Sequence, residues 1–455
     1  MSTRGLIIAG TASGVGKTSV TLGLLAALGE RVRIGSAKVG PDYIDPHLHA
    51  FATKRASYNL DPVLTGPSGV KASLARAARQ VDLVVVEGVM GLFDGTDLPS
   101  VDGTPAQPSL GSTAQVAQLT GLPVVLVMDC AHLSQSAAAV ALGYRSLDPD
   151  VHVVGIILNH LKSAAHEAFV REAMAAIGVE VLGVIPHGGL PTRDSRHLGL
   201  LTAEEAPTST REWITALGSA IRTHLELERI ISLAERIDID VADTGEAATV
   251  AGHPIIAYSK GPAASFIYPE NLELLREAGG DTVGFDPRYD SIPAEAGLIW
   301  LHGGYPENYR EEIASNQPLL DTLRKSVAMQ RPLVAECGGH LLLGDRLEDS
   351  QMAGILPFNS TISPRLTLGY RNARSTTSTS LLLSDRRTIP AHEFHYATST
   401  PQGDGIDLQT ARARWRAGYA SCSLLSSYLH WHLGADPGLA FALVSAASST
   451  GYSCE

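Results

Sequence analysis

A cysteine stands between an apolar run and a glycine pair in the stretch PLVAECGGHL. Cys337 would occupy a turn between a strand and a helix, where a thiol projects and its pKa is lowered, as a nucleophile requires. Glycine turns here and in LHGGYPE offer the backbone N–H groups of Gly303, Gly304 and Gly338 to an oxyanion. His430, in SSYLHWH, is a candidate general base far away in sequence. Together these residues predict acyl-transfer chemistry on an amide, although a cysteine alone would also suit a buried apolar position.

A second group of candidate residues lies near the N-terminus, in IIAGTASGVGKTSVTLGLLAAL. A glycine-bearing loop joins an apolar strand to a Lys-Thr pair that opens a helix, and this order points backbone N–H groups at bound phosphate. Lys17 would reach the outer phosphates and Thr18 would ligate Mg²⁺. The first glycine comes one residue too early for the strict GxxxxGK[ST] spacing, but the SGVGKT core is kept. The sequence therefore predicts a nucleotide site formed by Gly14, Gly16, Lys17, Thr18 and Ser19.

Carboxylates follow two further apolar runs. Asp42 and Asp45 lie in KVGPDYIDP, directly after the second run, and ligands of open α/β sheets collect at such strand ends. Glu87 ends the fully apolar run of VVVEGVMGLFDG, where an unpaired carboxylate rarely serves packing. Carboxylates beside a triphosphate are expected to hold Mg²⁺ directly or through water. His47 and His49 have no CxxC partner, so we expect turn or substrate contacts from them rather than metal ligation.

The elements that must position these residues follow from hydrophobic patterning. Short β-branched runs alternate with Ala- and Leu-rich stretches of helical spacing, which favours a buried parallel sheet covered by helices. Near 205–250 the pattern changes to a charged helical stretch, HLELERIISLAERIDID, followed by the Gly/Thr/Ala-rich VADTGEAATVAG, where a linker is expected. The alternation then restarts with PIIAYS, TVGF, GLIWLHGG and RPLVAECGG. The chain is therefore expected to form two α/β domains, 1–240 and 250–455. The strands expected in the first domain are 6–9, 32–37, 83–87, 123–129, 153–159 and 179–185.

The composition of the chain limits the kinds of molecule that it is expected to bind. The chain of 455 residues has a net charge of −12 and no Lys/Arg cluster, which argues against nucleic acid or an anionic membrane as a partner. No apolar run approaches the roughly 18 residues of a membrane span. Four cysteines without a CxxC spacing favour a reducing compartment and argue against a zinc site. We therefore expect a cytoplasmic protein that acts on small molecules.

These motifs resemble one family across nearly the whole chain. GTASGVGKT, KVGPDYIDP, VEGVMGLFDG, GSTAQVAQL, GGYPE, AECGGHLLL, HEFHY and SYLHWH occur in the order found in cobyrinic acid (hydrogenobyrinic acid) a,c-diamide synthases. The resemblance implies an ATP-dependent amidoligase domain similar to dethiobiotin synthetase, followed by a class I glutamine amidotransferase domain. It also implies a role in cobalamin biosynthesis, with ATP as co-substrate and Mg²⁺ as cofactor.

The resemblance also implies roles for individual residues. Cys337 would be the glutaminase nucleophile that forms a glutamyl thioester and releases ammonia, with His430 as general base. Many class I amidotransferases place Glu two residues after that histidine; His432 stands here, so the third member is left open. Ammonia would attack a carboxylate phosphorylated by ATP at the Lys17 loop. Metal ligands would be Thr18, Asp42 and Glu87, and corrinoid contacts would come from Tyr43, Asp45, Asp94, Ser112 and Thr113.

Alternatives stay open at this point. A nickel sirohydrochlorin a,c-diamide synthase shares these motifs and differs in its macrocycle, so the metal of the macrocycle is undecided. A partition-type P-loop ATPase shares the loop and the sheet but does not need Cys337, the GGYPE turn or a second α/β domain. A dethiobiotin synthetase would end near residue 230. The sequence does not decide the oligomeric state, and a homodimer is one arrangement left open.

Overall fold

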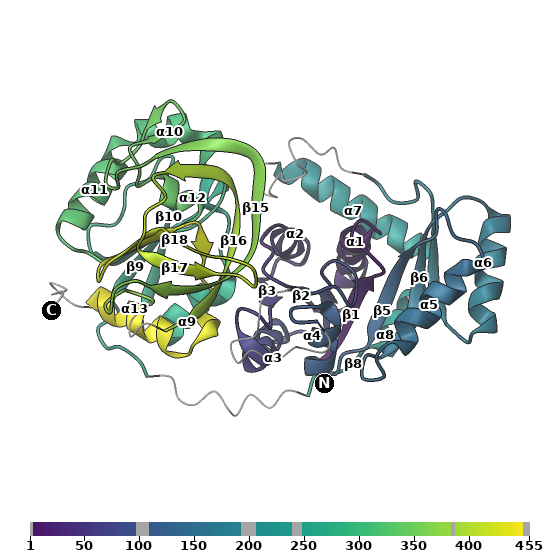
Figure 1. Ribbon diagram of the computed structural model, residues 1–455. Helices are drawn as coiled ribbons and strands as arrows, with labels where there is room; N and C mark the ends of the chain where they lie inside the picture. The colour runs from purple at the N-terminus through teal and green to yellow at the C-terminus, as the bar shows by residue number, and fades with distance from the viewer. Residues whose placement is uncertain (1–2, 97–108, 193–205, 239–247, 384–386, 449–455) are drawn as a thin grey trace. The chain divides into compact units, whose positions relative to one another are not determined.

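The computed structural model describes residues 3–96, 109–192, 206–238, 248–383 and 387–448 (Figure 1). The chain divides into two compact units, Met1–Asp243 and Thr244–Glu455. None of the described helices is long and apolar enough to cross a membrane.

The first unit is built on a parallel sheet with strand order β3-β2-β4-β1-β5-β6-β7, to which β8 (Glu235–Arg236) adds an antiparallel pair with β1. All six strands expected from the sequence are confirmed. The strand β3 was missed because its sequence, SYNL, has no apolar run, yet all four residues are buried. The parallel strands are β1 (Arg4–Gly10), β2 (Ile34–Val39), β3 (Ser57–Leu60), β4 (Leu83–Glu87), β5 (Val124–Asp129), β6 (Val153–Leu161) and β7 (Val181–Pro186).

Helices cover both faces of this sheet, because successive residues of each strand point to opposite sides. Along β1, Ile7 packs into one core cluster while Leu6 and Ile8 pack into the other. The first cluster takes its helical residues from α3 (Gly66–Ala77), α4 (Thr113–Thr120), α5 (Ser136–Ser146) and α6 (Ala164–Ala176). The second takes them from α1 (Lys17–Gly29), α7 (Pro207–His224) and α8 (Leu227–Leu233), and α2 (Ile44–Thr53) packs beside α1 and α7 (Figure 1).

The charged helical stretch that precedes the expected linker belongs to the first unit. Residues 206–238 form α7, α8 and β8, and Ile221, Leu227 and Ile230 are buried in the core of the first unit. The charged residues of this stretch occupy the outer face of an amphipathic helix pair, whose apolar face packs against the sheet. Residues 239–247 lie outside the described part of the chain.

The second unit also contains a mainly parallel sheet, with strand order β10-β9-β11-β12-β20-β19. The four strands expected here from the sequence are confirmed as β9 (Ile255–Ser259), β10 (Asp281–Phe285), β11 (Ala296–Leu301) and β12 (Leu333–Glu336). The other two are β19 (Tyr419–Ala420) and β20 (Leu424–Ser427). The helices of this unit are α9 (Pro269–Glu277), α10 (Arg310–Ser315), α11 (Gln317–Ala328), α12 (Gly338–Leu341) and α13 (Gly438–Ser448).

A second, mainly antiparallel sheet completes this unit and was not expected from the sequence. Its central pair, β15 (Asn359–Ser375) and β16 (Ile389–Thr400), forms the long curved strands of Figure 1. Most of β15 is exposed or half-buried, so it lacks the apolar run that marks a buried strand. The remaining strands are β13 (Arg346–Leu347), β14 (Ser350–Gln351), β17 (Ile406–Gln409), β18 (Arg414–Ala417) and β21 (Leu429–His430).

Candidate functional sites

The loop between β1 and α1 has the backbone of a phosphate-binding turn. Gly14 and Gly16 have φ values of 79° and 99°, in the left-handed region that favours glycine. A side chain at position 16 would also meet Asn159, because a Cβ there would lie 2.5 Å from its Nδ2. The same Nδ2 donates to the Val15 carbonyl at 2.9 Å. Asn159, at the end region of β6, therefore holds the loop in shape, a role that we did not predict.

Lys17 and Thr18 begin α1, with Ser19 beside them in the first turn. The Nζ atom of Lys17 donates to the Ala12 carbonyl at 2.9 Å, so the side chain folds back over the loop. Burial lowers the pKa of Lys17, the nearby Lys38 lowers it further, and neighbouring carboxylates oppose both effects. An ammonium group in this position can bind an anion, as the prediction of a phosphate site requires.

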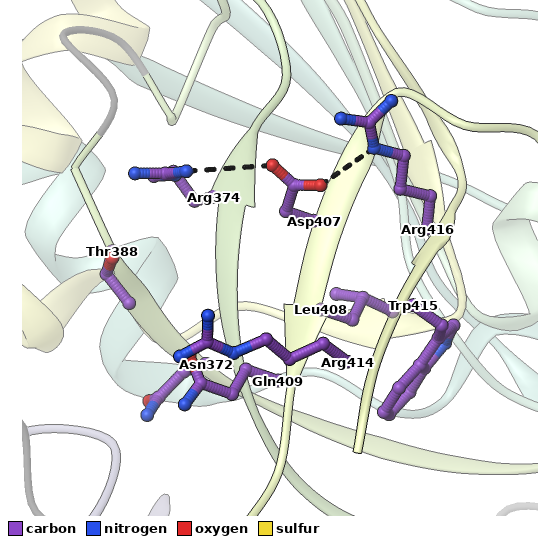
Figure 2. A pocket seen from close by; sticks show the side chains of 9 residues that line it. All are labelled: Asn372, Arg374, Thr388, Asp407, Leu408, Gln409, Arg414, Trp415 and Arg416. Atoms are coloured by element: carbon purple, nitrogen blue, oxygen red, sulfur yellow. Dashed lines mark hydrogen bonds and ion pairs between the residues drawn. The ribbon is translucent and has the colours of Figure 1, made fainter.

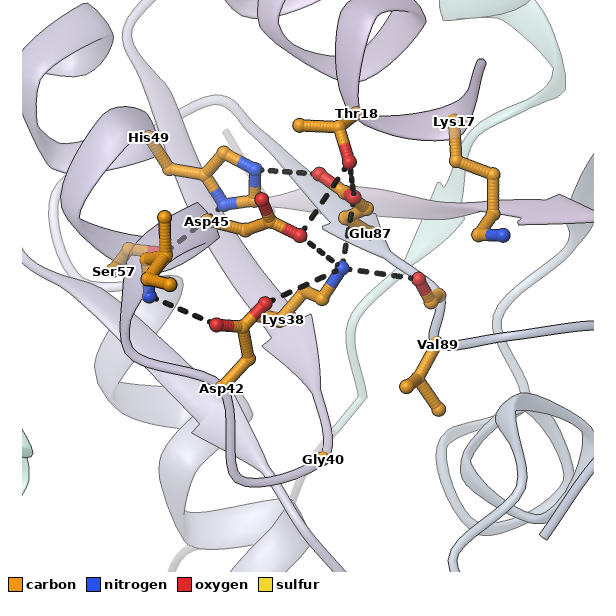
Figure 3. Close-up of polar contacts among 12 residues, drawn as sticks. Lys17, Thr18, Lys38, Gly40, Asp42, Asp45, His49, Ser57, Glu87 and Val89 are labelled. Atoms are coloured by element: carbon orange, nitrogen blue, oxygen red, sulfur yellow. Dashed lines mark hydrogen bonds and ion pairs between the residues drawn. The ribbon is translucent and has the colours of Figure 1, made fainter. Parts of the chain in front are cut away.

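Carboxylates meet the first turn of α1 (Figure 3). The Thr18 hydroxyl donates to Oε1 of Glu87 at 2.6 Å and lies 3.4 Å from Oδ2 of Asp45. Between these carboxylates lies Nζ of Lys38, 2.6 Å from Oδ2 of Asp45 and 2.8 Å from Oε1 of Glu87. Two carboxylates, one hydroxyl and one ammonium group therefore converge beside the phosphate loop, at the carboxyl ends of β2 and β4.

The charges of this cluster depend on one another. Burial, the largest influence, would lower the pKa of Lys38, but Asp45, Glu87 and Asp42 outweigh it and raise the pKa of Lys38 above its ordinary value. Burial raises the pKa of Asp45, and repulsion from Glu87 adds to that effect. Burial acts in the same direction on Glu87, yet Lys38 and His49 lower its pKa overall. Lys38 and His49 therefore favour the ionised form of Glu87.

His49 and Asn59 hold parts of this cluster in position through hydrogen bonds. His49 places Nε2 2.7 Å from Oε2 of Glu87, and its Nδ1 lies 3.4 Å from the Ser57 hydroxyl. This fully buried histidine is not a turn or substrate contact, as we expected, but a partner of a carboxylate. Asn59 donates to the carbonyls of Gly40 and Asp42 at 2.8 and 2.7 Å and so fixes the turn after β2. The unpredicted strand β3 supplies both Ser57 and Asn59.

Asp42 stands slightly apart from the other expected metal ligands. Its Oδ1 accepts a hydrogen bond from the Ile44 N–H at 2.8 Å, and its Oδ2 is 4.0 Å from Nζ of Lys38. The structure thus brings Asp45, rather than Asp42, to the Thr18 hydroxyl. Tyr43 lies between them in sequence, at the start of α2, and is mostly buried.

The other expected substrate contacts have backbone partners. Oδ2 of Asp94 accepts from the Gly91 N–H at 2.8 Å, and the Ser112 hydroxyl caps α4 by accepting from the Gln115 N–H at 3.1 Å. The Thr113 hydroxyl accepts from the Val89 N–H at 2.9 Å. Ser112 and Thr113 are fully buried, so the geometry gives them a role in shaping the loops around the phosphate site. Their contact with a corrinoid stays a prediction.

In the second unit, Cys337 occupies the expected turn between strand β12 and helix α12. Its φ of 46° is unusual for a residue with a side chain, and such turns hold a nucleophile at a fixed angle. The Cys337 N–H donates to the Ser427 carbonyl at 2.8 Å, and Sγ lies 3.3 Å from the Phe394 carbonyl. The N–H groups of Gly338 and Gly304 both point to the Cys337 sulfur and lower its pKa.

The lowered thiol pKa that we expected is wrong for this structure. Burial, followed by the charge of Glu307, outweighs the two N–H groups and raises the pKa of Cys337. Only 3% of the residue is exposed, and α12 is a single turn with little dipole to offer. Cys337 therefore rests as a thiol and needs a base to become a thiolate.

His430, the predicted base, lies close to Cys337. A Cβ built on Gly303 would lie 2.3 Å from Cε1 of His430 and 3.1 Å from Cβ of Cys337, so both side chains meet above this glycine. Burial lowers the pKa of His430, and three further histidines, His392 foremost, lower it more. Both influences favour the neutral imidazole, and the structure brings close together the two residues that the sequence predicted as nucleophile and base.

His432 occupies the position where many class I amidotransferases have the third catalytic residue, a glutamate. His432 accepts a hydrogen bond from the Gly434 N–H on Nδ1, and its Nε2 lies 3.9 Å from Oε2 of Glu270. Glu336, directly before the cysteine, accepts the Trp431 N–H at 3.0 Å and so ties β12 to the segment that carries His430. Glu336 was missed, although a carboxylate in the apolar run PLVAE is the same signal that identified Glu87.

The space over Cys337 is almost closed. The pocket there measures about 10 Å³, room for no more than about one water molecule. Aromatic side chains from four segments line it, together with Glu307, whose pKa burial raises to about 7. Glutamine cannot enter without movement of these side chains. The aromatic residues are Phe266, Tyr305, Phe394, Tyr396 and Tyr428.

Comparison with known proteins gives each unit a counterpart. Residues 6–200 match the CobQ/CobB/MinD/ParA nucleotide binding domain, and residues 255–438 match the CobB/CobQ-like glutamine amidotransferase domain. A P-loop unit joined to a glutamine amidotransferase unit defines a glutamine-dependent carbon–nitrogen ligase, in agreement with the two sites described above.

Curated relatives match over nearly the whole chain. The hydrogenobyrinate a,c-diamide synthase of Rhodobacter capsulatus is 40% identical over 88% of this chain and 91% of its own length. That of Streptomyces coelicolor is 36% identical over 96% of both chains. The cobyrinate a,c-diamide synthase of Syntrophotalea carbinolica is 36% identical over 98% of both. The chain therefore belongs to the cobyrinate and hydrogenobyrinate a,c-diamide synthase family.

Proposed function

We propose that this protein uses ATP and glutamine to amidate the a and c side-chain carboxylates of cobyrinate or hydrogenobyrinate in cobalamin biosynthesis. The observation that carries the proposal is the presence, in one chain, of a phosphate loop with a carboxylate cluster and of a cysteine–histidine pair with oxyanion donors. Near full-length relatives named for this activity support it.

In the glutaminase half, Cys337 attacks the side-chain amide of glutamine. His430 accepts the thiol proton and delivers it to the departing ammonia, and the N–H groups of Gly304 and Gly338 stabilise the oxyanion. Water then hydrolyses the glutamyl thioester to glutamate. Gly303 contributes by having no side chain, because its position leaves the space in which His430 and Cys337 meet.

In the ligase half, a carboxylate of the tetrapyrrole takes the terminal phosphoryl group of ATP, and ADP leaves. Ammonia attacks the resulting acyl phosphate, which gives the amide and inorganic phosphate. The N–H groups of the Gly14–Gly16 loop and the ammonium group of Lys17 bind the phosphates. Excluding water at this stage matters because an acyl phosphate is otherwise lost to hydrolysis.

The oxygen atoms beside the loop fit Mg²⁺, which is usually held by one or two carboxylates together with substrate phosphates. Thr18, Glu87 and Asp45 would hold it, and the magnesium would neutralise charge on the transferred phosphoryl group. Asp42 is 4.0 Å from Lys38 and is better placed to orient the turn and Lys38 than to ligate metal. Nζ of Lys38 bridges the two carboxylates and so holds Asp45 and Glu87 close to each other.

The test is amide formation by the purified chain with ATP, Mg²⁺, glutamine and one of three macrocycles: cobyrinate, hydrogenobyrinate or nickel sirohydrochlorin. Chromatography with mass detection should show a monoamide that appears first and a diamide that follows, because one phosphate loop serves both carboxylates. One of the first two macrocycles should be preferred. Exclusive use of the nickel compound would move the protein to the alternative pathway. ATP hydrolysis without any amide would contradict the proposal.

A further inference from the structure

The second unit carries a polar pocket well defined by strand register (Figure 2). The strands β15, β17 and β18 lie side by side and antiparallel, and residues paired across such strands project from the same face. Residues two apart on one strand share that face as well. Six polar side chains therefore project together. One register row consists of Arg374, Asp407 and Arg416, and the next of Asn372, Gln409 and Arg414.

The side chains on the opposite face of these strands anchor the backbone beneath the pocket. Ala373 and Leu408, which alternate with the polar residues, are buried in the core of the second unit. Trp415 packs against this core, and the Arg371 guanidinium stacks over its ring at 5.4 Å. Arg371 is held in turn by Glu393 at 2.8 Å. The backbone under the pocket is thus anchored, and the pocket measures about 500 Å³, within the range of small-molecule sites.

Charge in the pocket is strongly positive. Three arginines face one aspartate, so the sum is +3 − 1 = +2, on a chain whose net charge is −12. Asp407 lies 2.9 Å from Arg416 and 3.7 Å from Arg374 and is shared between them. Within the part of the chain that the structure describes, the Arg414 guanidinium has neither an ion pair nor a hydrogen bond. Its donors are available to an anion.

A second observation points to a ligand. Asn372 lines the pocket, is only 9% exposed, and its side-chain Oδ1 has no hydrogen-bond partner among the described residues. A buried carbonyl oxygen without a donor is unfavourable unless something supplies one. The strand β18 lies at the edge of the sheet, where charged side chains commonly prevent pairing with another chain. That role would explain its arginines, but it does not explain the buried Oδ1 of Asn372 beside them.

We propose that this pocket binds a polycarboxylate that also carries a hydrogen-bond donor such as a hydroxyl or an amide. Guanidinium groups bind carboxylates through paired hydrogen bonds, and the net charge of +2 matches two carboxylates. The donor would satisfy Oδ1 of Asn372, which an unsubstituted polycarboxylate cannot do. The site shares no lining residue with the pocket over Cys337, and it does not depend on the function proposed above.

Citrate and tricarballylate form a matched pair of probes, because they share three carboxylates and only citrate carries a hydroxyl. Titration calorimetry on the full chain without Mg²⁺, which citrate would chelate, should show one citrate site, with tricarballylate several-fold weaker. Arg414→Gln should weaken citrate binding about tenfold, the loss typical of one charge-assisted hydrogen bond. The matched control is Arg365→Gln, which removes an exposed arginine from β15 outside the pocket.

Absence of citrate and tricarballylate binding at millimolar concentration would overturn the proposal, as would an equal loss in Arg365→Gln, which would indicate non-specific attraction. A citrate affinity equal to that of tricarballylate would overturn the part assigned to Asn372. Competition with hydrogenobyrinic acid identifies the source of the carboxylates. Displacement of citrate that is lost in Arg414→Gln would assign the pocket to the peripheral side chains of the macrocycle, and citrate retained at saturation would assign it to a free polycarboxylate.

Discussion

Nε2 of His49 lies 2.7 Å from Oε2 of Glu87, while Oε1 of the same carboxylate accepts the Thr18 hydroxyl at 2.6 Å. Both His49 and Glu87 are fully buried. The histidine therefore determines which way the carboxylate turns, and the carboxylate presents its other oxygen to the first turn of α1. Partners of this kind orient metal ligands without touching the metal.

Replacing His49 with Ala should raise the Mg²⁺ concentration needed for half-maximal ATP turnover by about 10- to 100-fold, because Glu87 loses its orienting partner. His49→Gln, which can place an amide N–H near Oε2, should recover part of the loss. A Mg²⁺ titration of ATP turnover measures both. The half-buried His47 in the same helix gives the control, His47→Ala. Identical Mg²⁺ curves for wild type and His49→Ala would refute the role.

Cys337→Ser should lower glutamine-dependent synthesis by at least about 10³-fold, because a serine hydroxyl is a far weaker nucleophile in this position. Synthesis from added ammonium should continue, since the ligase half needs only ammonia. Product is measured with each nitrogen source at a pH that leaves some NH₃ present. Cys130→Ser, at a second free buried cysteine of the described residues, is the control. Normal product from glutamine would reduce Cys337 to a packing residue.

Gly303→Ala tests the meeting point of nucleophile and base. The added methyl group would lie 2.3 Å from Cε1 of His430, so the imidazole must move. A displacement of about 1 Å at a reacting group can cost on the order of 10²-fold, and glutamine hydrolysis should fall by that factor while ammonia-dependent synthesis is kept. Gly143→Ala, on an exposed helical position with open space around it, should change neither rate. An unaffected glutaminase rate in Gly303→Ala would argue against this placement of His430.

Lys17→Ala should abolish synthesis from glutamine and from ammonium alike, with a loss on the order of 10²-fold or more, because one charged contact to the phosphates is removed. The assay that was used for Cys337→Ser distinguishes the two variants. Glutamine hydrolysis in the second unit should survive, which shows that this unit of the variant is folded; the circular dichroism melting curve of the whole variant, compared with wild type, checks the first unit. Retained ammonium-dependent synthesis would be incompatible with a phosphate-binding role for Lys17.

Glu307→Gln addresses stability as a function of pH. Burial raises the pKa of Glu307 to about 7, so the folded chain keeps a proton that the unfolded chain loses at lower pH. The stabilising contribution of this group is present below the unfolded pKa and is lost as the pH rises through about 7. The glutamine side chain at position 307 is neutral at every pH, so the variant should be more stable than wild type above pH 8, by on the order of 3 kcal/mol. Scanning calorimetry of both proteins at pH 5 and pH 8 measures the difference, with exposed Glu311→Gln as the control; a gap that does not widen with pH would contradict the shift.

Sequence patterns predicted those parts of the fold that rest on apolar runs. Every strand with a continuous β-branched run was located, and so were the glycines, Lys17 and Cys337 at the turns that follow such runs. The strand β3 and the β15–β16 sheet escaped because their residues are polar or half exposed, and tertiary contacts rather than local pattern decide their structure.

The candidate sites show the same division. Glu87 was identified because a carboxylate ended an apolar strand, but its partners Lys38 and His49 arrive from β2 and α2, and one chain position says nothing about such distant pairing. The ionisation state of Cys337 was predicted with the wrong sign. The turn suggested a lowered thiol pKa, whereas the depth of burial, which depends on β16 and β21, decides the outcome.

The nearly closed space over Cys337 also bears on the chemical lifetime of the protein. Oxidants and alkylating agents attack thiolates that they can reach, and here the sulfur is protonated and covered by aromatic rings. Between turnovers the nucleophile is therefore sheltered from peroxide and electrophiles. Because glutamine can reach the sulfur only if these side chains move, we expect damage to accumulate with the number of catalytic cycles rather than with time.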